Sequence, residues 1–260
     1  MSEPCFIDAH CHLSDSRMKD RARIAIREAQ AAGVGAFFLG GVESQEWHRQ
    51  LELKREFPNL VRTSYGIHPW TVERLSREAL EQEFLELERE ITNADALGET
   101  GLDFYKSRNP DRFSDQEEFF RRQLDLAKAY RKPLVLHVVK AHARAMERVK
   151  DSGPEVPIVV HSFSGSVEEA KAWARMGAFL SFSGGIAREG AGASQKSKEA
   201  LRGIPLSSLL FETDSPDQAF RPGVHEPRLV IEVYEAASRI LQVPLSELKE
   251  IVAENFSKIR

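Results

Sequence analysis

The sequence has little of what marks a secreted, membrane-bound or disulfide-stabilised protein. Its 260 residues include only two cysteines, Cys5 and Cys11, too few for a disulfide framework, and we expect both to be packing residues. No stretch approaches the roughly 18 uninterrupted apolar residues of a membrane-spanning helix. The first residues lack the basic, apolar and small-residue order of a secretion signal. We therefore expect a cytoplasmic protein with no membrane partner.

An excess of positive charge is also absent, as 36 basic residues face 40 acidic ones and the net charge is -4. This balance excludes a nucleic-acid binder held mainly by global positive charge, although it permits a local basic cleft. No Pro/Gly/Ser-rich linker divides the chain, and no segment indicates an obligate protein partner. With 42% hydrophobic and 29% charged residues, the composition favours one globular domain over residues 1–260.

Short apolar runs alternate with segments that have apolar residues at helical spacing, which is the pattern of βα units. Eight such units in about 250 residues match an α/β fold of the (β/α)8 or TIM-barrel type. A doubly wound open sheet, which also buries both faces of its strands, is the alternative. The predicted strands are Cys5 to Ala9, Ala36 to Gly40, Arg62 to Gly66, Ala94 to Gly98, Leu134 to His137, Ile158 to His161, Ala178 to Phe182 and Leu209 to Glu212.

Two Ser-x-x-Glu patterns predict where helices begin. Ser114 with Glu117 and Ser166 with Glu169 each have the spacing of a capping box ahead of an apolar stripe. Gly177 is placed to end the second of these helices.

Residues able to bind metal follow the predicted strands, at the end of the barrel where such enzymes place their active sites. His10 and His12 are two residues apart, so in an extended chain both imidazoles point to the same side while Cys11 faces away. An isolated His-x-His pair also occurs in loops without metal, so this motif alone decides nothing.

Glu99 follows the fourth predicted strand and is flanked by Gly98 and Gly101. These glycines permit close backbone approach. A carboxylate in the barrel mouth is costly unless a cation neutralises it, and the alternative is a salt bridge across the barrel top. Asp103 either caps or positions the next loop.

Two further histidines, His137 and His161, end apolar strands. A single histidine in such a place is often a core residue with satisfied hydrogen bonds, but two on neighbouring strands favour a shared site. After the last strand, Glu212 and Asp214 point to one side unless the strand has already ended, so only Asp214 is assigned to the mouth.

Four imidazoles and two carboxylates are enough for two divalent ions if one carboxylate bridges them. Mixed nitrogen and oxygen ligands favour Zn, Mn, Mg or a similar ion over a thiolate site. The predicted ligands are His10, His12, Glu99, His137, His161 and Asp214.

At these residues the sequence resembles the TatD family of metal-dependent deoxyribonucleases, in the amidohydrolase superfamily of barrels. The resemblance covers nearly the whole chain. Its motifs are Phe-Ile-Asp-Ala-His-Cys-His-Leu from position 6, Gly-Ile-His-Pro-Trp from 66, Gly-Glu-Thr-Gly-Leu-Asp-Phe-Tyr from 98, Leu-His at 136, His-Ser-Phe-Ser-Gly-Ser from 161 and Leu-Leu-Phe-Glu-Thr-Asp-Ser-Pro from 209.

The resemblance implies a role for each residue. Glu99 bridges two ions, and His68 lies at the site edge and contacts substrate or the nucleophilic water. Our own mechanistic hypothesis adds that Asp214 accepts the proton of the attacking water. The implied ion partners are His10, His12 and Asp214 for one ion, and His137 with His161 for the other.

The chain departs from the family pattern in two places. Val139 stands where the family usually has an arginine, a natural phosphate contact, and Lys140 follows as a partial substitute. His225-Glu226-Pro227 replaces the common Asn-Glu-Pro. Neither departure touches the predicted ligands, so both bear on the substrate rather than on hydrolysis.

The expected activity is exonucleolytic hydrolysis of DNA phosphodiesters by a metal-activated water, with a preference for single strands. Trp70, Phe104 and Tyr105 are candidates for base stacking. Basic residues in the loops predict a locally positive rim. These are Lys106, Arg108, Arg112, Lys140, Arg144, Arg188, Lys196, Lys198 and Arg221.

Two other functions stay open. The same ions serve hydrolases of esters, lactones, amides or aminoacyl bonds, and the loss of arginine at Val139 favours this reading slightly. A scaffold that keeps metal only for stability would be expected to lack ligands, and none is missing here.

Overall fold

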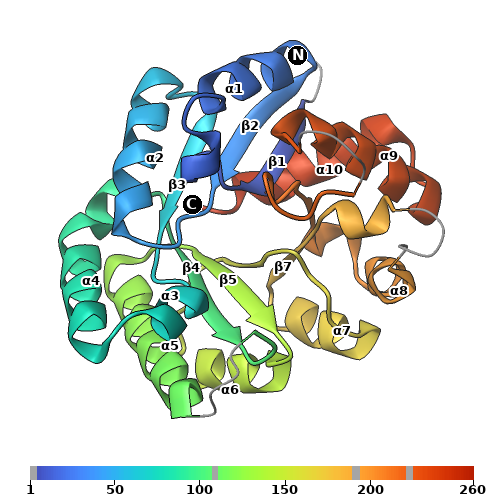
Figure 1. The fold of residues 1–260 in the computed structure, drawn as a ribbon. Coiled ribbons are helices and arrows are strands. Elements are labelled where there is room, and N and C mark those ends of the chain that lie inside the picture. The colour runs from blue at the N-terminus through green and yellow to red at the C-terminus, as the bar shows by residue number, and fades with distance from the viewer. Residues whose placement is uncertain (1–4, 107–110, 189–193, 221–224) are drawn as a thin grey trace.

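The computed structural model describes residues 5–106, 111–188, 194–220 and 225–260. Eight parallel strands form one sheet in sequence order. Figure 1 shows helices surrounding this sheet. The predicted TIM barrel is therefore confirmed. The strands are β1 (Phe6–Cys11), β2 (Val34–Leu39), β3 (Val61–Tyr65), β4 (Ala96–Asp103), β5 (Leu134–Val139), β6 (Ile158–Val160), β7 (Phe179–Phe182) and β8 (Leu209–Phe211).

The barrel closes where the chain leaving β8 returns to β1. Asp214 N–H donates to the carbonyl of His10 at 3.0 Å, and His12 N–H donates to the carbonyl of Ser215 at 2.7 Å. These bonds join the first and last strands, so the open doubly wound sheet is excluded. They also bring His10 and His12 close to Asp214, which lies about 200 residues later in the chain.

The helices alternate with the strands and cover the outside of the barrel. Within the described residues, none of them combines the length and apolarity needed to cross a membrane. The helices are α1 (Ala22–Ala31), α2 (Ser44–Glu56), α3 (Pro69–Arg74), α4 (Arg77–Glu90), α5 (Asp111–Tyr130), α6 (His142–Ser152), α7 (Val167–Arg175), α8 (Gln195–Gly203), α9 (Val230–Leu241) and α10 (Leu245–Ser257).

One of the two predicted capping boxes is confirmed. At the start of α7, Ser166 Oγ accepts from Glu169 N–H at 3.2 Å, and Glu169 accepts from Ser166 N–H at 2.6 Å. The prediction at Ser114 is wrong, because α5 already begins at Asp111. Phe113 packs against Phe104 with ring centroids 4.3 Å apart, and this tertiary contact favours the longer helix.

Strand β4 extends further than predicted, through Glu99 to Asp103. Gly98 and Gly101 have φ angles of 152° and 142°, which disfavour any side chain. A Cβ at Gly101 would lie 2.0 Å from the carbonyl oxygen of His137. The glycines therefore allow β4 to lie close against β5, which places Glu99 beside His137.

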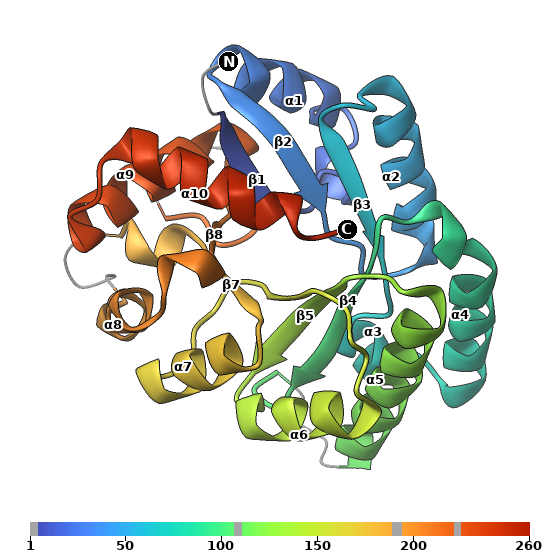
Figure 2. The ribbon, with the colours of Figure 1, turned by 180° about the vertical axis from the view of Figure 1, so that it is seen from behind.

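The end of the barrel where the strands begin is covered by α10, which lies in front of the strands in Figure 2. Asn255 donates to the carbonyl of Leu209 at the start of β8, and Arg62 of β3 donates to the carbonyls of Phe256 and Ile259. The functional cavity opens at the opposite end.

Candidate metal centre

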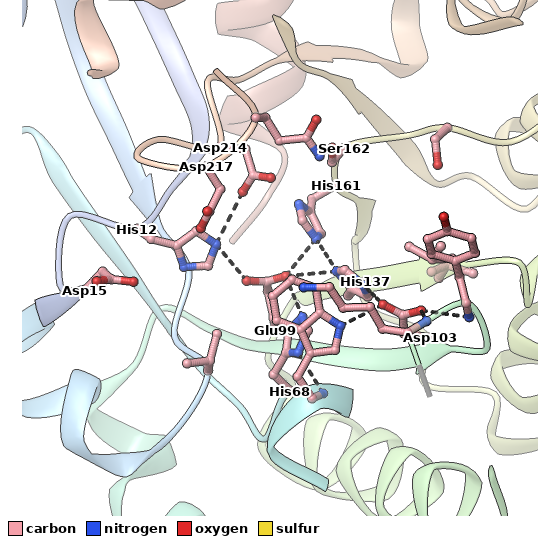
Figure 3. A pocket seen from close by; sticks show the side chains of 18 of the residues that line it. His12, Asp15, His68, Glu99, Asp103, His137, His161, Ser162, Asp214 and Asp217 are labelled. Carbon is pink, nitrogen blue, oxygen red and sulfur yellow. Dashed lines mark hydrogen bonds and ion pairs between the residues drawn. The ribbon is translucent and has the colours of Figure 1, made fainter. Parts of the chain in front are cut away.

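A cavity of about 380 Å³ opens where the strands end. Figure 3 shows side chains from several strands pointing into it. The structure brings the predicted ligands together, and all are buried apart from His137, whose side chain is 12% exposed. They are His10 and His12 from β1 and the residue after it, Glu99 from β4, His137 from β5, His161 after β6 and Asp214 after β8.

Glu99 lies between two pairs of imidazoles, and Figure 3 shows it between His12 on one side and His137 with His161 on the other. Its Oε2 is 3.0 Å from Nε2 of His12 and 3.2 Å from Nε2 of His10. Its Oε1 is 2.7 Å from Nε2 of His161 and 3.4 Å from Nδ1 of His137. Each carboxylate oxygen therefore faces its own pair of ring nitrogens.

Asp214 completes the His10 and His12 side of the centre. Its Oδ1 lies 3.3 Å from Nε2 of His12 and 3.9 Å from Nε2 of His10. Strand β8 ends at Phe211, and Asp214 adopts a left-handed φ of 58°. The turn after the strand, rather than strand alternation, directs this carboxylate into the cavity.

The neighbouring Thr213 is held from several directions. Asp8 accepts from its N–H at 2.9 Å and from its hydroxyl at 2.6 Å. His225 Nε2 donates to its carbonyl at 2.9 Å. The departure from the family pattern at His225 thus supplies a contact that fixes the main chain beside Asp214.

Each of the two histidines near Glu99 Oε1 has a carboxylate behind it. His137 Nε2 donates to Asp103 Oδ2 at 3.2 Å, which leaves the lone pair on Nδ1 directed toward Glu99. His161 Nδ1 lies 3.5 Å from Glu212 Oε1, with its Nε2 toward Glu99. Neither role is among those predicted from the sequence.

Strand alternation is the signal for Asp103, which lies four positions after Glu99 on β4 and shares its side. Glu212 and Asp214 both follow the end of β8, so alternation does not place them on one side. The sequence predicts Asp103 only as a residue that caps or positions the next loop, and it predicts no role for Glu212 because the end of β8 is not visible in it.

His68 is the N-cap of α3, and its Nδ1 accepts from Trp70 N–H at 3.0 Å. The neutral ring therefore carries its proton on Nε2, which lies 3.4 Å from Glu99 Oε1. Burial lowers the pKa of His68 to about 4, so the ring is neutral. A protonated Nε2 has no lone pair for a metal, and His68 is instead a hydrogen-bond donor at the site edge.

The electrostatics of the centre favour bound positive charge. Burial alone would raise the pKa of Glu99, but His161, His10 and His12 hold it well below its ordinary value. Burial would lower the pKa of His161, yet the charge of Glu99 raises it well above its ordinary value. The pocket therefore attracts either protons or a cation.

The donor set fits divalent metal. Among the residues that the structure describes, Glu99 Oε2 and Asp214 Oδ1 are buried without a hydrogen-bond partner. Ring nitrogens also converge, with His10 and His12 Nε2 atoms 3.3 Å apart and His137 Nδ1 3.1 Å from His161 Nε2. Lone pairs that meet this closely are stabilised by a shared cation.

Replacing Asp103 with asparagine tests how the centre is oriented. Loss of the carboxylate behind His137 should weaken metal binding about 10- to 100-fold, because the imidazole loses its fixed tautomer. Competition with a fluorescent chelator measures this affinity. Asp15→Asn, at the edge of the same cavity, is the control, and an equal loss in that variant would contradict the orienting role.

Two of the three aromatic residues predicted to stack bases line the cavity, and the third does not. Trp70 and Tyr105 line the cavity and are 41% and 72% exposed. Phe104 instead packs against Phe113 and the core, so it does not serve as a stacking surface.

Most of the predicted basic rim lies away from the cavity or is paired. Arg112 pairs with Asp115, and Arg144 pairs with Glu117. Lys140 is exposed in the loop after β5, outside the cavity lining. Of the rim residues that the structure describes, Lys106 alone lines the cavity. Arg108 and Arg221 lie outside the described residues.

Comparisons with known proteins identify the family of the chain. The metal-dependent hydrolase YjjV of Escherichia coli is 30% identical over 253 residues, covering 96% of this chain and 95% of that protein. The metal-dependent hydrolase YabD of Bacillus subtilis is 29% identical and covers 97% of both chains. The crystal structure of YjjV, a TatD homologue, superposes with a TM-score of 0.85 at 29% identity, covering 98% of this chain and 97% of that one.

A TatD family hydrolase of Entamoeba histolytica has the same fold, with a TM-score of 0.84 at 19% identity over 100% of this chain and 99% of that one. The family model described as TatD related DNase matches residues 7–259. The chain therefore belongs to the TatD family of metal-dependent hydrolases.

Proposed function

We propose that this hydrolase is a deoxyribonuclease that holds two divalent ions and cleaves single-stranded DNA from an end. The observation that carries the proposal is Glu99, whose two oxygens each face a separate pair of imidazole nitrogens at 2.7 to 3.4 Å. This is the placement of a bridging carboxylate, and paired ions suit the displacement of an ester oxygen at phosphorus.

The candidate ligands divide into two groups, one for each proposed metal position. Glu99 would bridge them, and Zn, Mn or Mg would suit the nitrogen and oxygen donors. When bound, such ions supply Lewis-acid chemistry that lowers the pKa of a water and polarises a phosphoryl oxygen. The first position would use His10, His12 and Asp214, and the second His137 through Nδ1 and His161 through Nε2.

Asp214 is proposed as the general base. It takes a proton from the attacking water as the new bond to phosphorus forms, and returns it to the departing ester oxygen. Burial would raise its pKa, but His12 and His161 lower it below its ordinary value, so the carboxylate is ionised. Its Oδ1 has no hydrogen-bond partner among the described residues.

His68 is proposed to contact substrate. Its Nε2–H points into the cavity beside Glu99, where it donates a hydrogen bond to a phosphate oxygen. Because Trp70 N–H fixes the tautomer, this donor is already oriented before substrate arrives.

The size and rim of the cavity favour a strand end as the substrate. A volume of about 380 Å³ has the scale of a site for a small molecule or a single nucleotide rather than a duplex. Exposed Trp70 and Tyr105 offer aromatic surface for unstacked bases. Lys140, exposed beyond the cavity, is proposed to meet a phosphate further along the strand.

Metal removal tests the proposal directly. Chelation should abolish hydrolysis of end-labelled single-stranded DNA and lower the melting temperature by about 5 to 10 °C, the effect of losing roughly 2.7 kcal/mol of binding free energy. Restoring Zn, Mn or Mg one at a time should return both, and the order of cleavage products reports the polarity.

A lower melting temperature without any turnover in the metal-loaded protein would favour a metal-stabilised scaffold. Unchanged activity after complete chelation would exclude the metal-dependent mechanism.

A second candidate is hydrolysis of a non-nucleic ester, lactone, amide or aminoacyl bond. The observation that favours it is Val139, which lines the cavity with an apolar side chain where the resembled family usually has arginine. A panel of ester and amide substrates, assayed beside DNA with the same metal-loaded protein, discriminates between the two functions.

A further inference from the structure

A lysine and a tryptophan lie against each other at the cavity edge. Lys106 Nζ is 3.2 Å from the centroid of the Trp70 ring, the geometry of a cation–π contact. Both side chains line the cavity, and Trp70 is 41% exposed. The pair stands at the entrance to the centre without belonging to the metal-binding set.

Lys106 is the cation of the described cavity lining that is available to bind a phosphate. The other non-histidine cation of the described lining is Arg17, which Asp15 and Asp217 neutralise at 2.7 and 2.6 Å. Lys106 has no carboxylate partner for its ammonium among the residues that the structure describes. A contact with an aromatic face is weaker than a contact with phosphate, so an incoming phosphate competes well for this ammonium.

One carboxylate connects the pair to the centre. Asp103 Oδ2 accepts from the Trp70 indole N–H at 2.7 Å and from His137 Nε2 at 3.2 Å. Asp103 Oδ1 accepts from the backbone N–H groups of Tyr105 and Lys106, each at 2.9 Å. The positions of Trp70 and of the Lys106 main chain are therefore fixed relative to a proposed metal ligand.

The tryptophan also borders the centre directly. Its ring centroid is 4.8 Å from that of His68 and 5.7 Å from that of His137, both at steep interplanar angles. A base resting on Trp70 would thus neighbour the residues proposed to bind the reacting phosphate.

We propose that Lys106 and Trp70 form a nucleotide subsite for single-stranded nucleic acid, in which the ammonium leaves the indole to bind a phosphate and a base stacks on the indole face. The proposal rests on the proposed function and adds the substrate groups that flank the reacting phosphate. Stacking accepts any base, so this subsite confers affinity with little sequence preference.

Intrinsic fluorescence gives a readout independent of turnover. Trp47 and Trp173 are 1% and 0% exposed, so Trp70 is the one accessible tryptophan of the three in the chain. Titrating the metal-loaded protein with a phosphorothioate oligothymidylate, which resists hydrolysis, should quench Trp70 emission. Trp70→Phe should abolish the quenching while retaining most of the affinity, and Trp70→Leu should weaken binding about tenfold.

The lysine is tested by salt dependence. Lys106→Met should reduce the slope of log affinity against log salt concentration by about 0.7, the value for one phosphate contact to a single strand, and Lys106→Arg should restore it. Lys249→Met is the matched control, because Lys249 also lies over an aromatic ring, 5.0 Å from the Phe6 centroid at the other end of β1.

An abasic oligomer of the same length separates the two parts of the subsite. With this oligomer, Lys106→Met should still have a smaller salt slope than the parent protein. Trp70→Leu and the parent protein should bind it with equal affinity. The proposal would be overturned if quenching persisted in Trp70→Phe. It would also be overturned if Lys106→Met changed the salt slope of the parent protein no more than Lys249→Met does.

The outcome also separates this subsite from the nuclease assignment. Quenching and the slope change without any DNA cleavage would retain the subsite and reject the nuclease function. Cleavage of DNA without either signal would retain the nuclease and reject the subsite.

Discussion

Replacing Asp214 with asparagine is expected to lower kcat about 10³-fold at saturating metal, within the range that general acid–base catalysis contributes. Asparagine keeps the shape of the side chain but cannot accept the proton of the attacking water. Because Asp214 Oδ1 has no hydrogen bond to lose among the described residues, the fold should be retained. The melting temperature should change by less than about 4 °C, equivalent to roughly 1 kcal/mol in a chain of this size.

Asp217→Asn is the matched control for this variant. Asp217 lines the same cavity three positions later, but its carboxylate pairs with Arg17 instead of pointing at the imidazoles. Its kcat should stay within about twofold of the parent, as expected for an exposed ion pair. Equal activity in Asp214→Asn and the parent protein would eliminate the proton-accepting role of Asp214.

Replacing Glu99 with glutamine is expected to have the second large effect. The substitution removes the one negative charge that both proposed metal positions share, so bound metal should fall from two ions to one or fewer per chain. Activity should drop by more than about 10³-fold, since stabilisation by paired ions is worth several kcal/mol. Elemental analysis after gel filtration measures the metal, and the DNA assay measures the rate.

Glu46→Gln is the control for loss of a buried carboxylate. Glu46 is buried and lines the same cavity, but it accepts from Val42 N–H at 3.2 Å rather than facing a pair of histidines. Two ions per chain in Glu99→Gln would refute the bridging role. A comparable loss of metal in Glu46→Gln would show that any buried charge in the cavity retains the ions.

The convergence of the site was predictable because parallel strands share one carboxyl end. His137 and His161 each follow an apolar run, so their meeting required only that both runs be neighbouring strands. His10 and His12 needed only strand alternation to face the same side, and the 3.3 Å between their ring nitrogens confirms it. Local pattern and barrel topology were sufficient for these residues.

Contacts between distant segments could not be predicted in this way. The role of Asp103 depends on β4 continuing past Glu99, which two glycines with positive φ permit. Glu212 points toward His161 because of where β8 ends. Lys140 is the basic residue next to Val139 in sequence, whereas the lysine that lines the cavity is Lys106, from the loop after β4.

The closure of the barrel by bonds between β1 and the segment after β8 has a consequence for biosynthesis. His10 and His12 leave the ribosome before Asp214, whose carboxylate lies on their side of the centre, because translation runs from the N-terminus. A nascent chain that stops before Asp214 has no bond from that residue to His10 and no partner from Thr213 for Asp8. Under the proposed assignment, such a chain lacks the carboxylate that completes the first metal position, so we expect no hydrolysis until the segment after β8 has been synthesised.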